Sequence, residues 1–125
     1  MARVLLVDDS RTVNAVISEM LSQIGLDVQS AFDGEEAIDC IKAEQYDVVI
    51  TDLIMPGLDG VALINYICRS LDDTTPKILA MSGGSKDTVD GATALDCVKH
   101  LVDRVMVKPF SKDELLDNLK GIGTV

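Results

Sequence analysis

The chain has 125 residues, of which 21 are acidic and 11 are basic, so its formal net charge is −10 at pH 7. This length suits one domain with one hydrophobic core, and we predict a single domain over residues 1–125. Because lysine and arginine form no cluster along the chain, direct binding to DNA or RNA is not expected.

The N-terminus and the cysteines indicate a location. The first apolar run is only four or five residues long and stops at Asp8, so it is neither a signal peptide nor a membrane span. The three cysteines, Cys40, Cys68 and Cys97, are widely spaced and lack a CxxC pair, which argues against a disulfide framework or a zinc site. We therefore expect three buried, reduced thiols and a cytoplasmic protein without membrane insertion.

The first part of the chain predicts two strand and helix pairs. An apolar run over residues 3–7 indicates a strand, and a helix follows between a capping Ser10 and Gly25. The apolar residues of that helix recur at three- and four-residue steps: Val13, Val16, Ile17, Met20, Leu21 and Ile24. A second strand is predicted over 27–31, and a second helix after a capping Asp33.

Two further strands and helices follow. Residues 47–51 predict the third strand, and Asp59 has the character of an N-cap for the third helix. Residues 77–81 predict the fourth strand. The stretch after it, 83–101, carries three glycines and little clean amphipathicity, so we expect its helix to be indistinct and mobile.

The chain closes with a fifth pair. Residues 104–107 predict a strand, and Ser111 and Glu114 have capping-box spacing at the start of the last helix. Strict alternation of five strands and five helices predicts an α/β fold, a doubly wound parallel sheet with right-handed crossovers and helices on both faces.

Charged and hydroxyl side chains stand where the predicted strands end. In such a sheet, ligands bind beyond the carboxyl ends of the strands. Asp8 and Asp9 follow the first strand, Asp52 the third, Ser82 the fourth and Lys108 the fifth. Each alone would be unremarkable as a cap, a turn residue or a surface charge. We expect the five to converge on one edge of the sheet.

Three carboxylates gathered at one edge repel one another unless a cation or a proton offsets their charge. Mg²⁺ prefers oxygen ligands and commonly takes one or two carboxylates together with a phosphate. We predict Asp9 and Asp52 as direct ligands, with the main-chain carbonyl of Ile54 completing the protein's share and Asp8 acting through water.

A carboxylate beside a bound metal ion can attack phosphorus, because the cation offsets the repulsion between nucleophile and phosphoryl oxygens. Asp52 is therefore a candidate covalent acceptor. Lys108 would pair with one phosphoryl oxygen, and Ser82 would donate its hydroxyl to another and draw the following loop inward.

Four motifs carry a family resemblance: "VLLVDDS", "VVITDLIMPGLDG", "ILAMSGG" and "VMVKPF". With these motifs, the chain from Val4 to about Leu119 resembles the receiver domains of two-component response regulators, in the stand-alone, chemotaxis-type form. The resemblance implies a flavodoxin-like sheet with strand order 2-1-3-4-5. It also implies a phosphorelay signalling protein that catalyses its own aspartyl phosphorylation and dephosphorylation, rather than an enzyme with a separate substrate.

The resemblance also assigns roles. It implies that Asp52 is the phosphoacceptor, Asp8 and Asp9 the acidic pair for Mg²⁺, Ser82 the switch hydroxyl and Lys108 the phosphate-binding lysine. It further implies a cis peptide bond before Pro109. The phosphodonor would be a phosphohistidine on a sensor kinase or phosphotransfer protein. If the 125 residues are the whole gene product and not an excised domain, output would pass to a downstream protein target, and the resemblance implies that the fourth helix, fifth strand and fifth helix form the signalling surface.

Some positions depart from the family pattern. Val105 stands where many receivers have a switching tyrosine or phenylalanine, and Leu101 and Val102 replace the usual Gly-Ala turn before the fifth strand. At the two positions tied to phosphate lifetime, an apolar Ile54 and a bare Gly84 predict slow hydrolysis of the acyl phosphate.

Other functions are less well supported. An FMN-binding flavodoxin needs a hydroxyl- and glycine-rich loop after the first strand, but here the loop carries two carboxylates that repel phosphate. Phosphatases of the haloacid-dehalogenase type space their two aspartates as D-x-D, whereas Asp8 and Asp9 are adjacent. The remaining alternative is a degenerate receiver that binds proteins without phosphorylation. We read the single histidine, His100, as a surface or packing residue.

Overall fold

The computed structural model describes residues 2–70, 75–83 and 89–125, and in this part of the chain strands and helices alternate as expected. The elements are β1 (Arg3–Val7), α1 (Arg11–Ile24), β2 (Asp27–Ala31), α2 (Gly34–Ala43), β3 (Val48–Asp52), α3 (Gly60–Ser70), β4 (Lys77–Ser82), α4 (Val89–Val98), β5 (Arg104–Val107) and α5 (Lys112–Gly121). Every strand lies within one residue of its predicted bounds.

The strands form one parallel sheet in the order β2-β1-β3-β4-β5, which confirms the predicted fold class and strand order. All five residues of β3 are buried, and four of the five in β1. A parallel strand covered on both faces needs side chains that tolerate burial on either side, so an uninterrupted apolar run suits these central strands.

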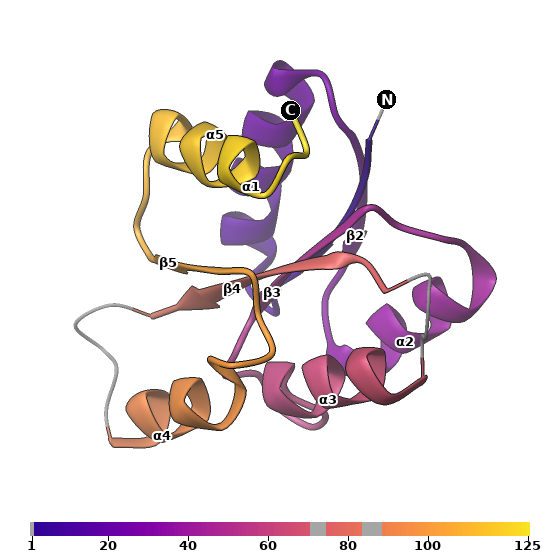
Figure 1. Ribbon diagram of the computed structural model, residues 1–125, viewed down its shortest axis with the longest axis vertical. Coiled ribbons are helices and arrows are strands. Elements are labelled where there is room, and N and C mark those ends of the chain that lie inside the picture. Colours follow the sequence, from indigo (N-terminus) through magenta and orange to yellow (C-terminus); the bar gives the residue numbers. More distant parts are fainter. Residues whose placement is uncertain (1, 71–74, 84–88) are drawn as a thin grey trace.

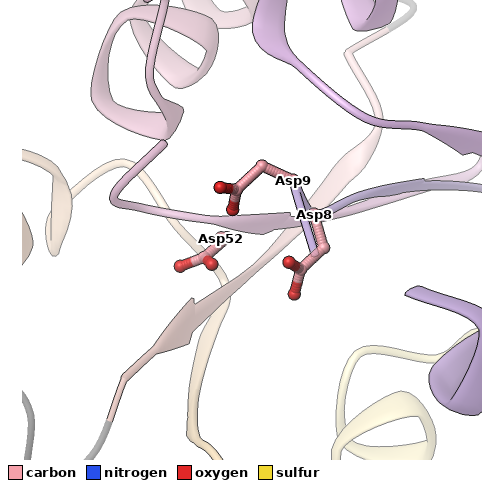
Figure 2. A group of neighbouring side chains, drawn as sticks. All are labelled: Asp8, Asp9 and Asp52. Atoms are coloured by element: carbon pink, nitrogen blue, oxygen red, sulfur yellow. The ribbon is translucent and has the colours of Figure 1, made fainter. Parts of the chain in front are cut away.

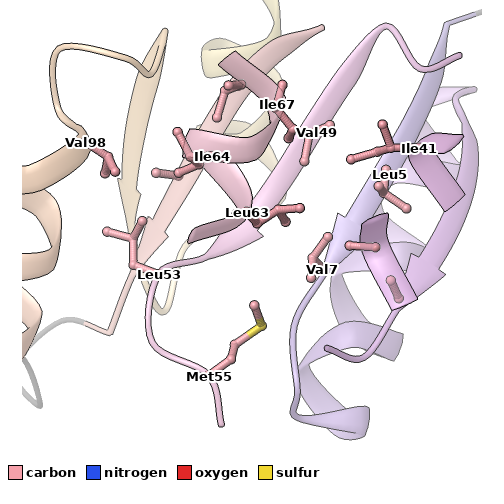
Figure 3. Packing of buried hydrophobic residues seen from close by; sticks show 14 of the residues in the cluster. Leu5, Val7, Ile41, Val49, Leu53, Met55, Leu63, Ile64, Ile67 and Val98 are labelled. Carbon is pink, nitrogen blue, oxygen red and sulfur yellow. The ribbon is translucent and has the colours of Figure 1, made fainter. Parts of the chain in front are cut away.

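Helices cover both faces of the sheet (Figure 1). Consecutive strand residues point to opposite faces, so Leu5 and Val49 belong to one core cluster and Leu6 and Ile50 to the other. The first cluster lies under α2, α3 and α4, and Figure 3 shows it from close by. The second lies under α1 and α5. Burying each such side chain stabilises the fold by roughly 1.5–3 kcal/mol.

Four predicted helix starts are confirmed by cap hydrogen bonds. Each capping side chain accepts a bond from the backbone N–H three residues later. The caps are Ser10 of α1 at 3.3 Å, Asp33 of α2 at 2.7 Å, Asp59 of α3 at 3.0 Å and Ser111 of α5 at 3.1 Å. The predicted stop of α1 is also present, because Gly25 has the left-handed conformation with φ of 97°.

The buried face of α1 differs from the predicted one. Val16 is 51% exposed, whereas Asn14 is 1% exposed and lies on the buried face with Ile17 and Leu21. The helix is therefore rotated toward the side of Asn14. On that face the Asn14 amide donates hydrogen bonds to main-chain carbonyls, which the apolar spacing did not reveal.

Part of the prediction for the region around α4 falls on residues that the structure describes. The stretch expected to hold an indistinct, mobile helix is 83–101; residues 84–88 lie outside the described part of the chain, and α4 begins after them at Val89. Leu101 and Val102, the departures from the family's turn, are partly buried and pack against the core under α4. The Leu101 N–H donates to the Val98 carbonyl at 2.7 Å, and His100 between them is exposed.

The three cysteines are free thiols, as predicted, but their burial was predicted wrongly. Cys40 and Cys68 are half-buried, and Cys97 is exposed next to the fully buried Val98 on α4. A helix that packs along one stripe leaves neighbouring positions in solvent, which accounts for Cys97. No helix among the described residues is long and apolar enough to cross a membrane.

Candidate functional site

The register of the sheet brings the predicted residues to one edge. Val7 of β1 pairs with Thr51 of β3, so Asp8 and Asp52 emerge at the same level. Ser82 ends β4 and pairs with Val107 of β5, which places Lys108 next to it at the strand ends. The predicted convergence at the carboxyl edge is therefore present in the structure.

Three carboxylates form the acidic part of this edge (Figure 2). One oxygen from each of Asp8, Asp9 and Asp52 lies within 4.8 Å of the others. Asp8 is fully buried and Asp52 is 8% exposed, while Asp9 lies open to solvent. The cluster thus has two buried members and one that faces water.

Lys108 joins the two buried carboxylates. Its Nζ donates to Asp52 Oδ2 at 2.9 Å and to Asp8 Oδ2 at 3.1 Å. Burial by itself lowers the pKa of the Lys108 ammonium, but its contacts with Asp52 and Asp8 outweigh this and leave the pKa raised. One ammonium therefore stays charged between two carboxylates, and a third carboxylate stands beside them.

Burial and neighbouring charges also shift the pKa of Asp52. Burial raises its pKa above 3.8, Lys108 lowers it, and the nearby charge of Asp8 raises it again, so the net shift is upward. The Ile54 N–H also approaches Asp52 Oδ1, at a long 3.5 Å. Even with Lys108 as its charged partner, the Asp52 carboxyl group is harder to ionise than a free aspartate, because burial and the charge of Asp8 together outweigh the lysine.

Asp8 is held on both its side chain and its main chain. Its Oδ1 accepts from the Ser10 N–H at 2.9 Å, and its own N–H donates to the Ala31 carbonyl of β2 at 3.2 Å. Together with Lys108, these bonds satisfy a carboxylate that has no exposure to water. Asp8 is therefore a fixed part of the edge.

The loop after β3 is packed tightly against Asp52. Gly60, the first residue of α3, lies so close that a Cβ there would be 2.0 Å from the Asp52 carbonyl oxygen and 2.7 Å from Leu53 Cα. The Gly60 N–H donates to the Leu53 carbonyl at 3.1 Å. Sequence reasoning did not single out Gly60, although its place directly after the capping Asp59 was a signal.

Ile54 and Ser82 occupy different surroundings at this edge. Ile54 lies in the loop after β3 and is 50% exposed. Ser82 is 8% exposed, and its carbonyl accepts from the Lys108 N–H at 2.8 Å. The Lys108–Pro109 peptide bond is cis, as the resemblance implied. Gly84, paired with Ile54 in the prediction of slow hydrolysis, lies outside the described residues.

Asn14 is a residue of this region that sequence reasoning did not single out. It lies on α1, and its side-chain amide reaches the main chain at the end of β1. The available signal was a polar residue between the apolar positions Val13 and Ile17, where a helix that packs against a sheet is expected to be apolar.

Comparisons with known proteins identify the family of the chain. The model of the response regulator receiver domain family matches residues 4–120. The chain is 35% identical over 96% of its length to response regulator MprA of Mycolicibacterium vanbaalenii, and 36% identical over 90% of its length to transcription factor SKN7 of Saccharomyces cerevisiae. It spans 49% of MprA and 17% of SKN7.

Solved structures give the same result at the level of the fold. Chemotaxis response regulator CheY4 of Vibrio cholerae is similar with a TM-score of 0.83 and 28% identity, over 96% of this chain and 97% of that one. A Francisella response regulator receiver domain is similar with a TM-score of 0.78 and 30% identity, over 96% and 94%. The chain belongs to the response regulator receiver domain family.

Proposed function

We propose that residues 1–125 form one receiver domain in which Asp52 accepts a phosphoryl group from a phosphohistidine on a sensor kinase or phosphotransfer protein. The observation that carries this proposal is the setting of Asp52: a nearly buried carboxylate between two further carboxylates and an ammonium. Family membership supports the same reaction.

The donor set fits Mg²⁺. Oxygens of Asp8 and Asp52 lie within 4.8 Å of each other, and two unit charges at that spacing repel by about 3.5 kcal/mol or more at an effective dielectric constant of 20 before any counter-charge offsets them. Oxygen-only ligands favour a hard divalent cation. Asp9 and Asp52 would bind it directly, Asp8 through water, and Ile54 through its main-chain carbonyl. When bound, the ion offsets the negative charge of the incoming phosphoryl group.

The chain's own residues account for the transfer. A carboxylate oxygen of Asp52 forms a bond to phosphorus while the bond between phosphorus and the donor histidine nitrogen breaks, and the imidazole leaves with the electron pair and takes up a proton. Lys108, already at hydrogen-bond distance from Asp52, would exchange part of that contact for a phosphoryl oxygen.

Phosphorylation would then be transmitted to a partner. Ser82 sits at the adjacent strand end and would donate its hydroxyl to a second phosphoryl oxygen. Val105 and Val107 are exposed on β5, where a downstream protein target would read the change together with α4 and α5. Val105 has no aromatic ring that could rotate on phosphorylation, so the motion of Ser82 would carry the switch.

Three free cysteines suit a reducing compartment, and this supports a cytoplasmic location for the proposed phosphorelay. A protein that self-catalyses phosphoryl transfer and release on its own aspartate acts as a switch rather than as an enzyme on a separate substrate. Binding without phosphorylation, as in a degenerate receiver, remains the competing function, but all five side chains that the reaction needs are present.

Labelling with a small phosphodonor tests the proposal. Acetyl phosphate with Mg²⁺ should phosphorylate the wild-type chain, and omission of Mg²⁺ or the substitution Asp52→Asn should abolish the label. Asp59→Asn is a matched control, because Asp59 is a helix cap in the same loop. The control should label like the wild type. Absence of label from the wild type under all conditions would favour the degenerate receiver. If label forms, phosphotransfer from a panel of histidine kinases would identify the donor.

A further inference from the structure

Asn14 is a buried polar side chain with every hydrogen-bonding group of its amide engaged. Its Nδ2 donates to the Asp8 carbonyl at 3.3 Å and to the Ala31 carbonyl at 3.1 Å. Its Oδ1 accepts from the Ser30 hydroxyl at 2.7 Å. With 1% exposure, no water competes for these bonds, and α1 is thereby fastened to the ends of β1 and β2.

The orientation of this amide follows from its partners. Rotating it by half a turn would place Oδ1 against two carbonyl oxygens and Nδ2 against the Ser30 hydroxyl, losing both donor bonds to carbonyls. The Ala31 carbonyl also accepts from the Asp8 N–H at 3.2 Å. Asn14 and Ala31 therefore hold the main chain of Asp8 from both of its sides.

The carbonyl that Asn14 binds belongs to the peptide unit between Asp8 and Asp9. A peptide unit is planar, so fixing the direction of its carbonyl also fixes the direction of its N–H and the starting point of the next residue. Asp9 is exposed, and the described contacts give it no side-chain hydrogen bond of its own. The position of its carboxylate thus depends on the main chain that precedes it.

We propose that Asn14 is a positioning residue for the acidic cluster: it orients the Asp8–Asp9 peptide so that the Asp9 carboxylate meets those of Asp8 and Asp52. The inference rests on the proposed role of this cluster in binding Mg²⁺. Residues that orient metal ligands without touching the metal commonly change metal affinity by 10–100-fold when they are replaced. Asn14 would act in this way through the main chain.

The test is the Mg²⁺ affinity of two variants that weaken α1 in different ways. Asn14→Leu keeps a similar side-chain volume but removes the bonds to both carbonyls. Leu21→Ala is the matched control, because Leu21 is fully buried on the same face of α1 and lies among apolar residues of the core. Amide chemical shifts of isotope-labelled protein, followed during Mg²⁺ titration without phosphodonor, report binding directly; the chain lacks tryptophan as a fluorescent reporter.

The Mg²⁺ dissociation constant should rise by on the order of tenfold in Asn14→Leu and stay at the wild-type value in Leu21→Ala. Unchanged affinity in Asn14→Leu, or an equal loss in Leu21→Ala, would overturn the positioning role. If Asn14→Leu does not fold, Asn14→Ser is read by the same two criteria, since its side chain is too short to reach both carbonyls. A wild-type protein that fails to bind Mg²⁺ would instead contradict the metal site of the proposed function.

Discussion

Gly60→Ala tests whether the start of α3 positions the end of β3. The added Cβ would lie 2.0 Å from the Asp52 carbonyl oxygen, and a Cβ atom essentially never approaches another heavy atom closer than 3.0 Å, so the two backbones must separate by about 1 Å. The contacting atoms are main chain, and the Asp52 carbonyl also accepts from the Thr51 hydroxyl at 2.9 Å. Relief of the clash therefore has to move the strand end or the helix.

Overpacking of this kind costs about 2 kcal/mol, within a typical range of 1–3 kcal/mol. Gly121→Ala is the matched control, because its Cβ would meet only the Arg104 guanidinium, the mobile end of a long side chain, at 2.4 Å. Both substitutions gain the helix preference of alanine over glycine, so their difference isolates the steric cost. For a chain of this length, the melting temperature of Gly60→Ala should lie roughly 8 °C below that of Gly121→Ala.

Thermal and urea unfolding followed by circular dichroism measure this difference. The initial rate of labelling by acetyl phosphate should also fall in Gly60→Ala and remain unchanged in Gly121→Ala, because only the former displaces Asp52. Equal stability of the two variants would show that the strand end moves freely, and would contradict close packing between Gly60 and the end of β3.

Three further predictions concern the charges and thiols. Mg²⁺ at ten times its dissociation constant should raise the free energy of unfolding by about 1.4 kcal/mol in the wild type and by clearly less in Asp9→Asn, as urea titration would show. Burial raises the pKa of Asp52 above 3.8, so the folded state holds the carboxyl proton more tightly than the unfolded state does. In EDTA, the free energy of unfolding of the wild type should therefore fall relative to that of Asp52→Asn as pH rises from 3.8 through the raised pKa. Parallel pH profiles of the two proteins would contradict this. A thiol reagent at neutral pH should modify the exposed Cys97 first, and Cys40, whose pKa is raised by burial, roughly tenfold more slowly. Mass spectrometry of the labelled peptides measures the two rates, and faster labelling of Cys40 would contradict the prediction.

The sequence contained the signals that act locally. Capping residues and strand runs depend on neighbours a few positions away, so Ser10, Asp33 and the strand bounds could be predicted. The meeting of Asp8 and Asp52 was also predictable, because parallel strands end at one edge whatever the details of their packing.

The features that were predicted wrongly or missed all depend on contacts between elements that form only when the chain packs. The rotation of α1 about its axis, which buries Asn14 and exposes Val16, is set by carbonyls of β1 and β2 that the helix meets only after docking. The need for glycine at position 60 likewise comes from a carbonyl eight residues earlier that tertiary packing brings within contact. Cys97 looked like a core residue because cysteine is usually buried, but its exposure depends on how α4 sits against the core.

The central claim is that Asp52 itself carries the phosphoryl group, and chemical trapping of the acyl phosphate tests it most directly. Protein treated with acetyl phosphate and Mg²⁺ is reduced with borohydride, which converts a phosphorylated aspartate to homoserine, and peptide mass spectrometry locates the change. Homoserine should appear at position 52 in the wild type, require Mg²⁺, and be absent from Asp52→Asn. Homoserine at Asp8, Asp9 or another residue, with Asp52 unmodified, would contradict the account.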